Sequence, residues 1–347
     1  MSLQSIWPST VHGEWIEDNA EEELVSVIVP TYNRLHHLPD ALASVWDQTY
    51  RPLELIVIDD GSTDGTTELV QEWASEHHQK RGFTVRYERQ PNRGAPSARN
   101  LGAIRSSGEF LQFLDSDDRI HKRKIETQVQ LLREEEPEAG FAYCLTGRFG
   151  PGAFGQQPTG FDFNEAGLPS MLEANMCQTS AALFRRSACK DAGPWDESLE
   201  GAQEWEFIHR VVVAADLQVC FQPEVYNHVR AYQDDGRISK NDVRHLEARL
   251  NAIGRVQNLY EHTGHLARRD ISWNMAMSYL QIAFLLHDHN PDGPPVRKAL
   301  ERAANVAPTL VRSVTILLQV LQRASPSGFG LAKRTIRQIR KVGRQLR

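Results

Sequence analysis

Three carboxylates follow directly after a short apolar run at residues 110–114. The run reads Phe-Leu-Gln-Phe-Leu, which is typical of a buried strand, and the acids are Asp115, Asp117 and Asp118. Like charges at the mouth of a core strand repel one another and resist burial, so a cation is expected to neutralise them. Ligation by oxygen atoms alone suits Mg²⁺ or Mn²⁺. The alternative is a solvated turn, because Asp is common in turns.

Short apolar strands and helical patterns alternate around these acids. Strands are predicted at residues 24–29, 52–58, 84–88 and 109–114, with helices at 37–48, 65–73 and 95–106 between them. This order predicts an α/β domain with a mostly parallel central sheet flanked by helices. Ligands of such sheets bind beyond the carboxyl ends of the strands. Residues 30–33, 59–62 and 115–118 lie at such ends, so three polar loops are expected to converge on one crevice.

The net charge, the cysteine spacing and the apolar runs of the sequence limit the partners and the cellular compartment that are expected. The chain has 347 residues and a net charge of −6, which gives no argument for a nucleic-acid polymer as a partner. Its four cysteines include no C-x-x-C pair, so structural zinc is not expected and a reduced compartment fits better than a disulfide scaffold. Residues 1–23 read as a polar leader without signal-peptide features, and no apolar run reaches the ~18–20 residues of a membrane span. We therefore expect a cytoplasmic protein.

The last third of the chain changes to helical patterns only. We predict one domain over residues 24–240 and a helical region over 241–347. Its final segment, residues 331–347, holds seven Lys and Arg side chains and no acid, with apolar positions spaced like one helix face. Such a helix is a candidate for peripheral contact with the inner face of an anionic membrane. The alternatives are a helix packed on its own domain or frayed in solvent, and the region is also a candidate homodimer contact.

Four other motifs fit the sequence poorly. Counted from Asp60, the acidic loop resembles a calcium loop, but its twelfth position is Gln71 and not the bidentate Glu that such a loop requires. The Asp-x-Asp at 115–117 is not followed by the Thr of aspartyl phosphatases. No glycine-rich dinucleotide fingerprint or phosphate loop follows the first strand.

Four motifs in order form a far more specific pattern. They are residues 27–34 (Val-Ile-Val-Pro-Thr-Tyr-Asn-Arg), 58–64 (Ile-Asp-Asp-Gly-Ser-Thr-Asp), 92–102 (Asn-x-Gly-x-x-x-Ala-Arg-Asn-x-Gly) and 108–118 (Gly-Glu-x-x-x-Phe-Leu-Asp-Ser-Asp-Asp). With this spacing the sequence resembles the family 2 glycosyltransferases, whose fold is the Rossmann-like GT-A fold. The resemblance covers residues 24 to about 240 and offers no motif for the helical region.

The resemblance implies transfer of a sugar from a nucleotide-diphosphate donor, preferably a UDP-sugar, to an acceptor hydroxyl with inversion at the anomeric carbon. It implies Mn²⁺ or Mg²⁺ as cofactor. It also implies a carbohydrate, lipid-linked or small-molecule acceptor in polysaccharide or glycoconjugate biosynthesis. The implied metal ligands are Asp118, Asp117 and Asp115, with Asp118 as the direct ligand. The implied nucleotide-binding residues are Pro30, Thr31, Tyr32, Arg34, Asp59, Arg99 and Asp117.

The residue types suit these implied roles. Tyr32 stacks on the base or packs within its loop, and Asp59 hydrogen-bonds the base, with Asp60 supporting it or the ribose. The fork of the Arg99 guanidinium matches diphosphate oxygens, although a surface salt bridge is the alternative for this residue. Asp117 contacts either the ribose or the water shell of the metal. The metal offsets charge on the leaving diphosphate.

An inverting transfer also needs a general base near the acceptor hydroxyl. The family pattern places it as the Asp of a Glu-Asp-Trp motif after a Gly-x-Phe-Asp-Glu loop. Here these segments read Gly-Pro-Trp-Asp-Glu (193–197) and Gln-Glu-Trp-Glu (203–206). Glu204 therefore takes the base position with one extra methylene, and Gln203 replaces the usual Glu. Glu206 is the alternative base, or else a charge that favours the helix start.

Other roles and functions stay open. His228 is a candidate late metal ligand or an ordinary hydrogen-bonded strand residue, and Arg237 is a candidate phosphate contact in a lid over residues 232–240. A nucleotidyltransferase would want a glycine-rich basic loop after the first strand, where this chain has Pro-Thr-Tyr-Asn-Arg. A non-catalytic nucleotide-sugar or glycan-binding protein on the same fold is favoured only by the Gln203-Glu204 departure.

Overall fold

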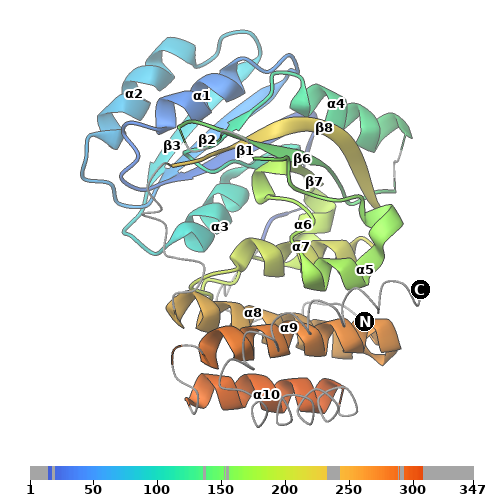
Figure 1. The fold of residues 1–347 in the computed structure, drawn as a ribbon. Helices are drawn as coiled ribbons and strands as arrows, with labels where there is room; N and C mark the ends of the chain where they lie inside the picture. Colours follow the sequence, from blue (N-terminus) through green and yellow to red (C-terminus); the bar gives the residue numbers. More distant parts are fainter. Residues whose placement is uncertain are drawn as a thin grey trace. The chain divides into compact units, whose positions relative to one another are not determined.

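The computed structural model describes residues 15–17, 20–135, 138–151, 153, 156–232, 243–287, 289 and 293–307. The chain divides into two compact units, with the boundary after Arg237. The first unit is an α/β domain and the second is helical (Figure 1).

One eight-stranded sheet organises the first unit, in the order β3-β2-β1-β4-β7-β6-β8-β5. β1 (Glu21–Thr31), β2 (Leu53–Asp59), β3 (Phe83–Arg89) and β4 (Gly108–Phe113) run parallel, as the alternating sequence pattern predicts. β7 (Ala182–Arg185) is antiparallel to β4 and to β6 (Phe141–Phe149), while β8 (Val219–Arg230) is parallel to β6. The short strand β5 (Arg119–Ile120) pairs antiparallel with β8. The sheet is therefore mixed, and its parallel half carries the three predicted loops.

Helices cover both faces of this sheet (Figure 1). α1 (Leu38–Trp46), α2 (Thr66–His77) and α4 (Lys124–Gln130) lie on one face, and α3 (Ala95–Arg105) and α6 (Arg186–Ala192) lie on the other. α7 (Gln203–Ala214) packs against α6, and α5 (Phe163–Glu173) precedes a 3-10 turn at Thr179–Ala181. Burial on both faces explains why β2 is buried along its whole length, whereas β3, at the edge of the sheet, includes exposed polar residues.

The close approach of α3 to the sheet depends on Gly102. A Cβ at this position would lie 2.3 Å from Cγ2 of Ile28 on β1, so a larger residue would push the helix away. Ala98 of the same helix packs with Ile56 and Ile58 of β2. This packing matters for the site because α3 also carries Arg99.

A buried polar network joins α4, β4 and the 3-10 turn. Lys124 is fully buried, and its Nζ donates hydrogen bonds to the side-chain oxygens of Gln112 and Gln128. The amide groups of these glutamines donate in turn to the carbonyls of Ser180 and Ala181, both at 3.0 Å. Because burial disfavours the charged amine, it lowers the pKa of Lys124 to about 8.

Replacing Lys124 with methionine is expected to remove a pH dependence of stability. The folded pKa of about 8 lies below the ordinary value of 10.5, so between these values the unfolded chain binds the extra proton. The free energy of unfolding of the wild type should therefore rise relative to K124M by on the order of 3 kcal/mol as pH increases through this window. Urea unfolding across the window measures it. Lys122→Met, at an exposed neighbouring position, is the matched control and should show no such slope.

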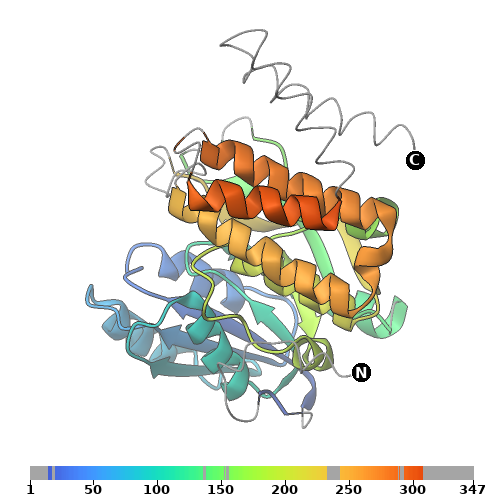
Figure 2. The ribbon, with the colours of Figure 1, turned by 90° about the horizontal axis from the view of Figure 1, so that it is seen from below.

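The described residues of the second unit form three α-helices and a short 3-10 helix at His265–Ala267, and this helical content agrees with the sequence pattern. α9 (Arg269–His287) packs against α8 (Val243–His262) and α10 (Pro294–Val306), as Figure 2 shows. Arg302 of α10 donates a hydrogen bond to the carbonyl of Leu250 on α8 at 3.2 Å. Within the part of the chain that the structure describes, no helix is both long and apolar enough to cross a membrane.

Some predicted features fall at the margins of the described residues. β1 begins at Glu21, inside the segment predicted as a leader, and the Trp15 indole N–H donates to the carbonyl of Cys189 at 3.1 Å. Arg237, most of the predicted lid and the basic segment 331–347 lie outside the described residues. Their proposed roles in phosphate, membrane or partner contact therefore stay predictions.

Candidate functional site

The carboxyl ends of β1, β2 and β4 bring the three predicted loops together. Thr31 at the end of β1 is in register with Asp59 at the end of β2. On the other side of β1, the Leu114 N–H donates to the carbonyl of Ile28 at 2.9 Å. Arg34 lies 4.0 Å from the carboxylate of Asp117, which links the first loop to the third. The convergence expected from the strand order is thus present.

Asp59 is buried at the end of β2. Its carboxylate accepts hydrogen bonds from the backbone N–H of Ser62 (2.8 Å) and from the hydroxyls of Thr67 (2.9 Å) and Tyr87 (2.8 Å). Burial acts to raise the pKa of Asp59, but these hydrogen bonds outweigh it and hold the pKa below its ordinary value. In the adjoining loop the Tyr32 side chain is 47% exposed, so its ring is accessible to a ligand.

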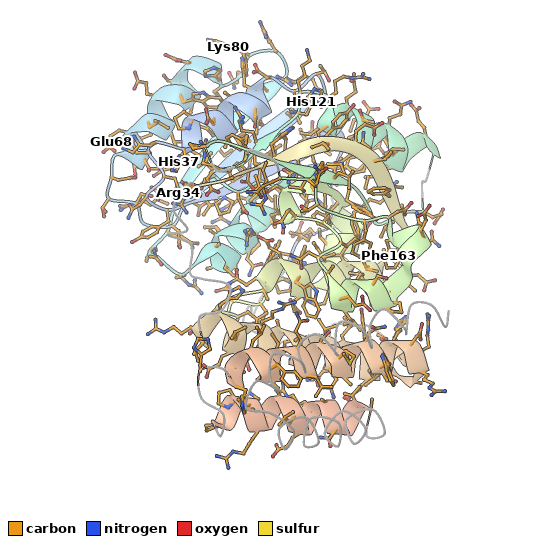
Figure 3. The ribbon with its side chains drawn as sticks, viewed as in Figure 1. Arg34, His37, Glu68, Lys80, His121 and Phe163 are labelled. Atoms are coloured by element: carbon orange, nitrogen blue, oxygen red, sulfur yellow. The ribbon has the colours of Figure 1, made fainter. Side chains whose placement is uncertain are left out.

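Replacing Asp59 with asparagine is expected to lower stability at neutral pH, by a margin that shrinks in acid. The folded pKa of Asp59 lies below 3.8, so the carboxylate stabilises the fold above that value and this stabilisation is lost as pH falls through the folded pKa. Urea unfolding at neutral pH and at about pH 3 measures the change. Glu68→Gln, at the surface of α2 (Figure 3), should match the wild type at both pH values. Equal destabilisation of D59N at both would contradict the assignment.

The carboxylate of Asp60 is occupied by hydrogen bonds to residues of its own chain. One carboxylate oxygen accepts from the Gln90 side chain (2.7 Å) and the Arg93 N–H (2.9 Å), and the other accepts from the Gly94 N–H (2.8 Å). These contacts fix the loop that enters α3. Asp60 therefore positions α3, and with it Arg99, through its own hydrogen bonds.

Arg99 presents an incompletely satisfied guanidinium. Its side chain is 5% exposed, and Nη2 donates to Asp115 at 2.7 Å. Among the described residues, Nε and Nη1 are buried and have no hydrogen-bond partner. The surface salt bridge considered from the sequence is wrong, since this ion pair is buried on the arginine side. An anion with several oxygens would satisfy the remaining N–H groups.

Asp118 is the most buried acid of the predicted cluster. It is 3% exposed and accepts long hydrogen bonds from the Arg230 N–H (3.2 Å) and the Ser180 hydroxyl (3.4 Å). Burial raises the pKa of Asp118 well above its ordinary value, and the nearby charges of Asp115, Asp117 and Glu204 raise it further. A bound cation would relieve this repulsion.

The residues present fit a metal ion whose coordination shell is completed by water and by the phosphates of a bound substrate. Among the described residues there is no group of three or more His, Cys, Asp or Glu side chains arranged to hold a metal. Asp115 is paired with Arg99, and Asp117 accepts from the Tyr232 hydroxyl at 2.9 Å. Mg²⁺ and similar ions are commonly bound by one or two carboxylates, with waters and substrate phosphates completing the shell. Asp118 with one neighbour suits that mode, whereas a preformed cage of three acids is not present among these residues.

Two residues of the β8 end contact the acid cluster. Arg230 reaches Asp118 through its N–H, and its guanidinium donates to the carbonyl of Asp117 at 3.3 Å. Tyr232 contacts His37 at 5.7 Å between ring centroids, with the two rings roughly perpendicular. His37 and Arg34 lie close together in Figure 3.

His228, in contrast, is in register with Arg119, and burial together with that cation lowers the pKa of His228. The described contacts therefore place His228 beside a cation.

Glu204 lies in the first turn of α7 and faces the acid cluster closely enough to affect its titration. Its charge contributes to the raised pKa values of both Asp118 and Cys177, after burial. Ala202, at the start of the helix, has a left-handed backbone (φ 56, ψ 24) that is unfavourable for a residue with a Cβ. Gln203, the departure from the family pattern, donates to the carbonyl of Leu199 at 2.5 Å. Strained backbone next to an acid is common at functional sites.

Glu206 forms a buried ion pair. Its two oxygens accept from Nε and Nη2 of Arg210 at 2.7 and 2.8 Å, and Arg210 also donates to the carbonyls of Ala192 and Gly193. Glu206 lies in the first turn of α7, where the sequence expects an acid that favours the helix start, and both of its oxygens are bound to an internal cation. As a general base it stays the alternative prediction to Glu204. Through Arg210 it also ties α7 to the loop that begins at Gly193.

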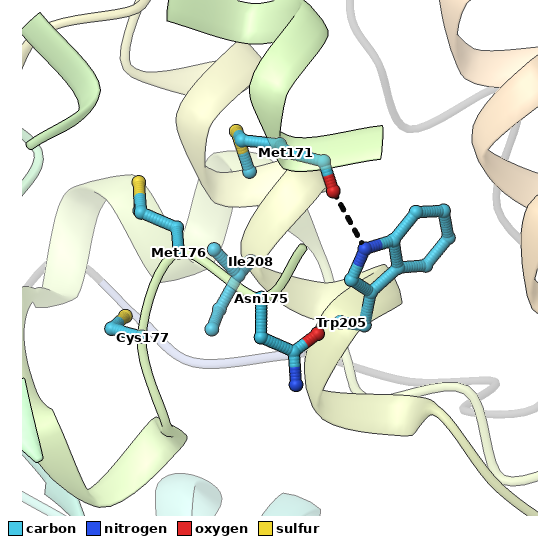
Figure 4. A pocket seen from close by; sticks show the side chains of 6 residues that line it. All are labelled: Met171, Asn175, Met176, Cys177, Trp205 and Ile208. Carbon is cyan, nitrogen blue, oxygen red and sulfur yellow. Dashed lines mark hydrogen bonds between the residues drawn. The ribbon is translucent and has the colours of Figure 1, made fainter. Parts of the chain in front are cut away.

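A small pocket of about 10 Å³ is lined by Trp205, the residue after Glu204 in sequence (Figure 4). Ile208 lines it one helical turn after Glu204, and Trp205 closes one side by donating its indole N–H to the carbonyl of Met171 at 2.9 Å. The full lining is Met171, Asn175, Met176, Cys177, Trp205 and Ile208.

Sequence patterns alone did not identify Ser180 or Asn100 as site residues, and they placed Tyr232 at the start of the predicted lid without predicting its contact with Asp117. Asn100 donates to the carbonyl of Trp195 and to Glu197, and accepts from the Trp195 N–H, which ties α3 to the 193–197 loop. Its position next to Arg99 in the third motif was the available signal. Ser180 and Tyr232 lie 62 and 115 residues from their acidic partners, so no local pattern could have found them.

The fold is that of GT-A glycosyltransferases. A fragment of S. aureus TarS (residues 1–349) in complex with UDP-GlcNAc superimposes with a TM-score of 0.63 and 19% identity, over 92% of each chain. Mannosyltransferase PcManGT from Pyrobaculum calidifontis, in complex with GDP-Man and Mn²⁺, gives 0.57 and 18%, over 93% of this chain and 87% of that one.

Sequence comparison points to one family. Residues 26–193 match the model of glycosyl transferase family 2. An uncharacterized glycosyltransferase of Rickettsia felis is 42% identical over 110 residues, which is 32% of this chain and 17% of that protein. The putative teichuronic acid biosynthesis glycosyltransferase TuaG of Bacillus subtilis is 40% identical over 124 residues, or 36% and 46%. The chain thus spans less than half the length of these relatives.

Proposed function

We propose that this protein is a metal-assisted, inverting glycosyltransferase that moves a sugar from a nucleotide-diphosphate donor, preferably UDP-linked, to an acceptor hydroxyl. The observation that carries the proposal is the position of Asp118. It is a buried acid with a raised pKa that stands within electrostatic reach of both the donor loops and Glu204. One cation bound there would meet a diphosphate on one side, with a carboxylate base on the other.

The donor would occupy the carboxyl ends of β1, β2 and β4. Tyr32 offers an exposed ring to the base, and Asp59 is an ionised acceptor at the bottom of the same loop pair. The two unpaired N–H groups of Arg99 would bind diphosphate oxygens. Asp118, with Asp117 or Asp115, would hold Mn²⁺ or Mg²⁺, which supplies Lewis-acid stabilisation of the leaving diphosphate.

Glu204 would act as the general base. In an inverting transfer the acceptor hydroxyl attacks the anomeric carbon from the face opposite the diphosphate, and its proton passes to a carboxylate near that face. A cation bound at Asp118 would lower the electrostatic repulsion between that acid cluster and the Glu204 carboxylate. Its extra methylene relative to Asp lets it reach an acceptor that sits slightly further from α7.

The residues on the acceptor side of the site indicate a class of acceptor and not one particular molecule. The residues of the small pocket that includes Trp205 are largely apolar, which suits contact with an apolar part of an acceptor at the surface and not its enclosure. The name of the Bacillus relative connects it with teichuronic acid biosynthesis, which favours a polysaccharide or glycoconjugate acceptor here. A cytoplasmic location would give access to nucleotide sugars.

A binding protein without catalysis is the second candidate. It is favoured by Gln203, whose amide donates a hydrogen bond to the Leu199 carbonyl at a position where the family pattern has an acid.

One assay distinguishes the two functions. We would incubate the protein with UDP- and GDP-sugars and Mn²⁺ and follow donor hydrolysis and transfer to simple acceptors. Donor-specific turnover supports the transferase; metal-dependent binding without turnover supports the binding protein; no binding of any nucleotide would contradict both.

A further inference from the structure

We propose that Trp195 is a positioning residue that holds Arg99 on the donor side and the first turns of α7, with Glu204, in one fixed arrangement. The proposal rests on the proposed function, because it assigns Arg99 to the diphosphate and Glu204 to the proton. Trp195 is fully buried in the 193–197 loop, between α6 and α7 in the chain. Nothing in its local sequence pattern predicts contact with Arg99.

The indole forms the middle layer of a three-part stack. The Phe207 ring lies nearly parallel to it, at 13° and 4.0 Å between ring centroids. Cζ of Arg99 lies over the indole at 4.6 Å from the centroid. Since Phe207 covers one face at close range, the guanidinium occupies the other. Phe207 is on α7, three residues after Glu204, so the stack joins the donor-side arginine to the helix that carries the base.

The contact with the indole leaves the N–H groups of Arg99 available. A cation over an aromatic face is attracted by the charge distribution of the ring, and this attraction uses none of the N–H groups as hydrogen-bond donors. Nη2 of Arg99 donates to Asp115, and Nε and Nη1 have no hydrogen-bond partner among the described residues. The indole thus restrains the arginine without using the N–H groups that a diphosphate would need.

The loop itself is anchored to α3 next to Arg99. The Asn100 side chain accepts from the Trp195 N–H at 2.8 Å and donates to the Trp195 carbonyl at 3.0 Å. Phe113, at the end of β4, contacts the indole edge-on at 5.3 Å between centroids. Trp195 is therefore held from α3, β4 and α7 together, and its β4 contact, Phe113, lies two residues before Asp115.

Two substitutions distinguish a positioning role of the Trp195 ring from a role that only fills space in the core. Trp195→Phe keeps an aromatic face between Arg99 and Phe207, whereas Trp195→Leu removes it. Phe83→Leu is the matched control, because Phe83 is also fully buried beneath an arginine, Arg51, with 5.4 Å from Cζ to the ring centroid, but at the amino end of β3. Three measurements are made on each variant: UDP affinity with Mn²⁺, kcat and KM for donor hydrolysis, and amide hydrogen exchange of residues 95–105 and 203–214.

We expect W195L to weaken UDP binding and to lower kcat, each by about tenfold, as loss of a buried cation–π contact predicts. Exchange should rise in both segments. W195F should stay within about threefold of the wild type in both parameters, and F83L should lose stability without a change in kcat or KM. Kinetics of W195L like those of F83L, or exchange that rises in only one segment, would overturn the positioning role. Absence of UDP binding and turnover in the wild type would instead overturn the proposed function, and with it any catalytic role of Trp195.

Discussion

Replacing Asp118 with asparagine is expected to abolish metal-dependent UDP binding. Asparagine preserves the shape of the side chain and its contacts with Ser180 and the Arg230 N–H, but it removes the charge that would hold the cation. We expect UDP affinity in the presence of Mn²⁺ to fall by about 100-fold or more, since the remaining acids are already bound to Arg99 and Tyr232. Isothermal titration with UDP, with and without Mn²⁺, measures the change.

Two controls make this result specific to the cation. Asp47→Asn removes one acid from an exposed position after α1 and should bind UDP like the wild type. Chelation of the metal should reduce the wild type to the affinity of D118N and leave D118N unchanged. The metal-free D118N protein should be at least as stable as the wild type, because the substitution relieves repulsion among buried acids. Wild-type UDP affinity and Mn²⁺ dependence in D118N would exclude Asp118 from the metal site.

Glu204→Gln is expected to lower kcat by about 10²–10⁴ while leaving UDP affinity unchanged, because a general base acts on the reaction and not on donor binding. The variant keeps the size and hydrogen-bonding capacity of the side chain, so α7 should fold normally. Steady-state kinetics with a donor and acceptor found in the nucleotide-sugar screen measure the change, and UDP titration verifies that the donor site is intact.

Glu206→Gln provides the contrast on the same helix. It breaks a buried ion pair and leaves Arg210 without its charge partner, so we expect a loss of about 3–5 kcal/mol in the free energy of unfolding. The fraction that stays folded should turn over like the wild type. If folded E206Q instead loses turnover and E204Q retains it, the base is Glu206 and the alignment on Trp205 is wrong.

Local patterns in the sequence were sufficient for the donor half of the site. Short apolar runs separated by helical spacing predict parallel strands, and parallel strands place their carboxyl ends together. Thr31 therefore stands beside Asp59, and Asp118 lies just beyond β4, as the order of the motifs implies. The polar residue types at these ends were visible because each is adjacent in sequence to the strand that positions it.

The tertiary structure alone decided which side chains these acids and cations contact. Asp60 and Glu206 both look like free carboxylates in sequence, yet one binds the entrance of α3 and the other binds Arg210. Arg230 meets Asp118 across 112 residues because of the register of β8, and Trp195 meets Arg99 because the 193–197 loop packs onto α3. A sequence pattern gives the type of a residue and its place on an element. The partner is set by packing between elements far apart in the chain, where burial and hydrogen bonding then determine its charge and its role.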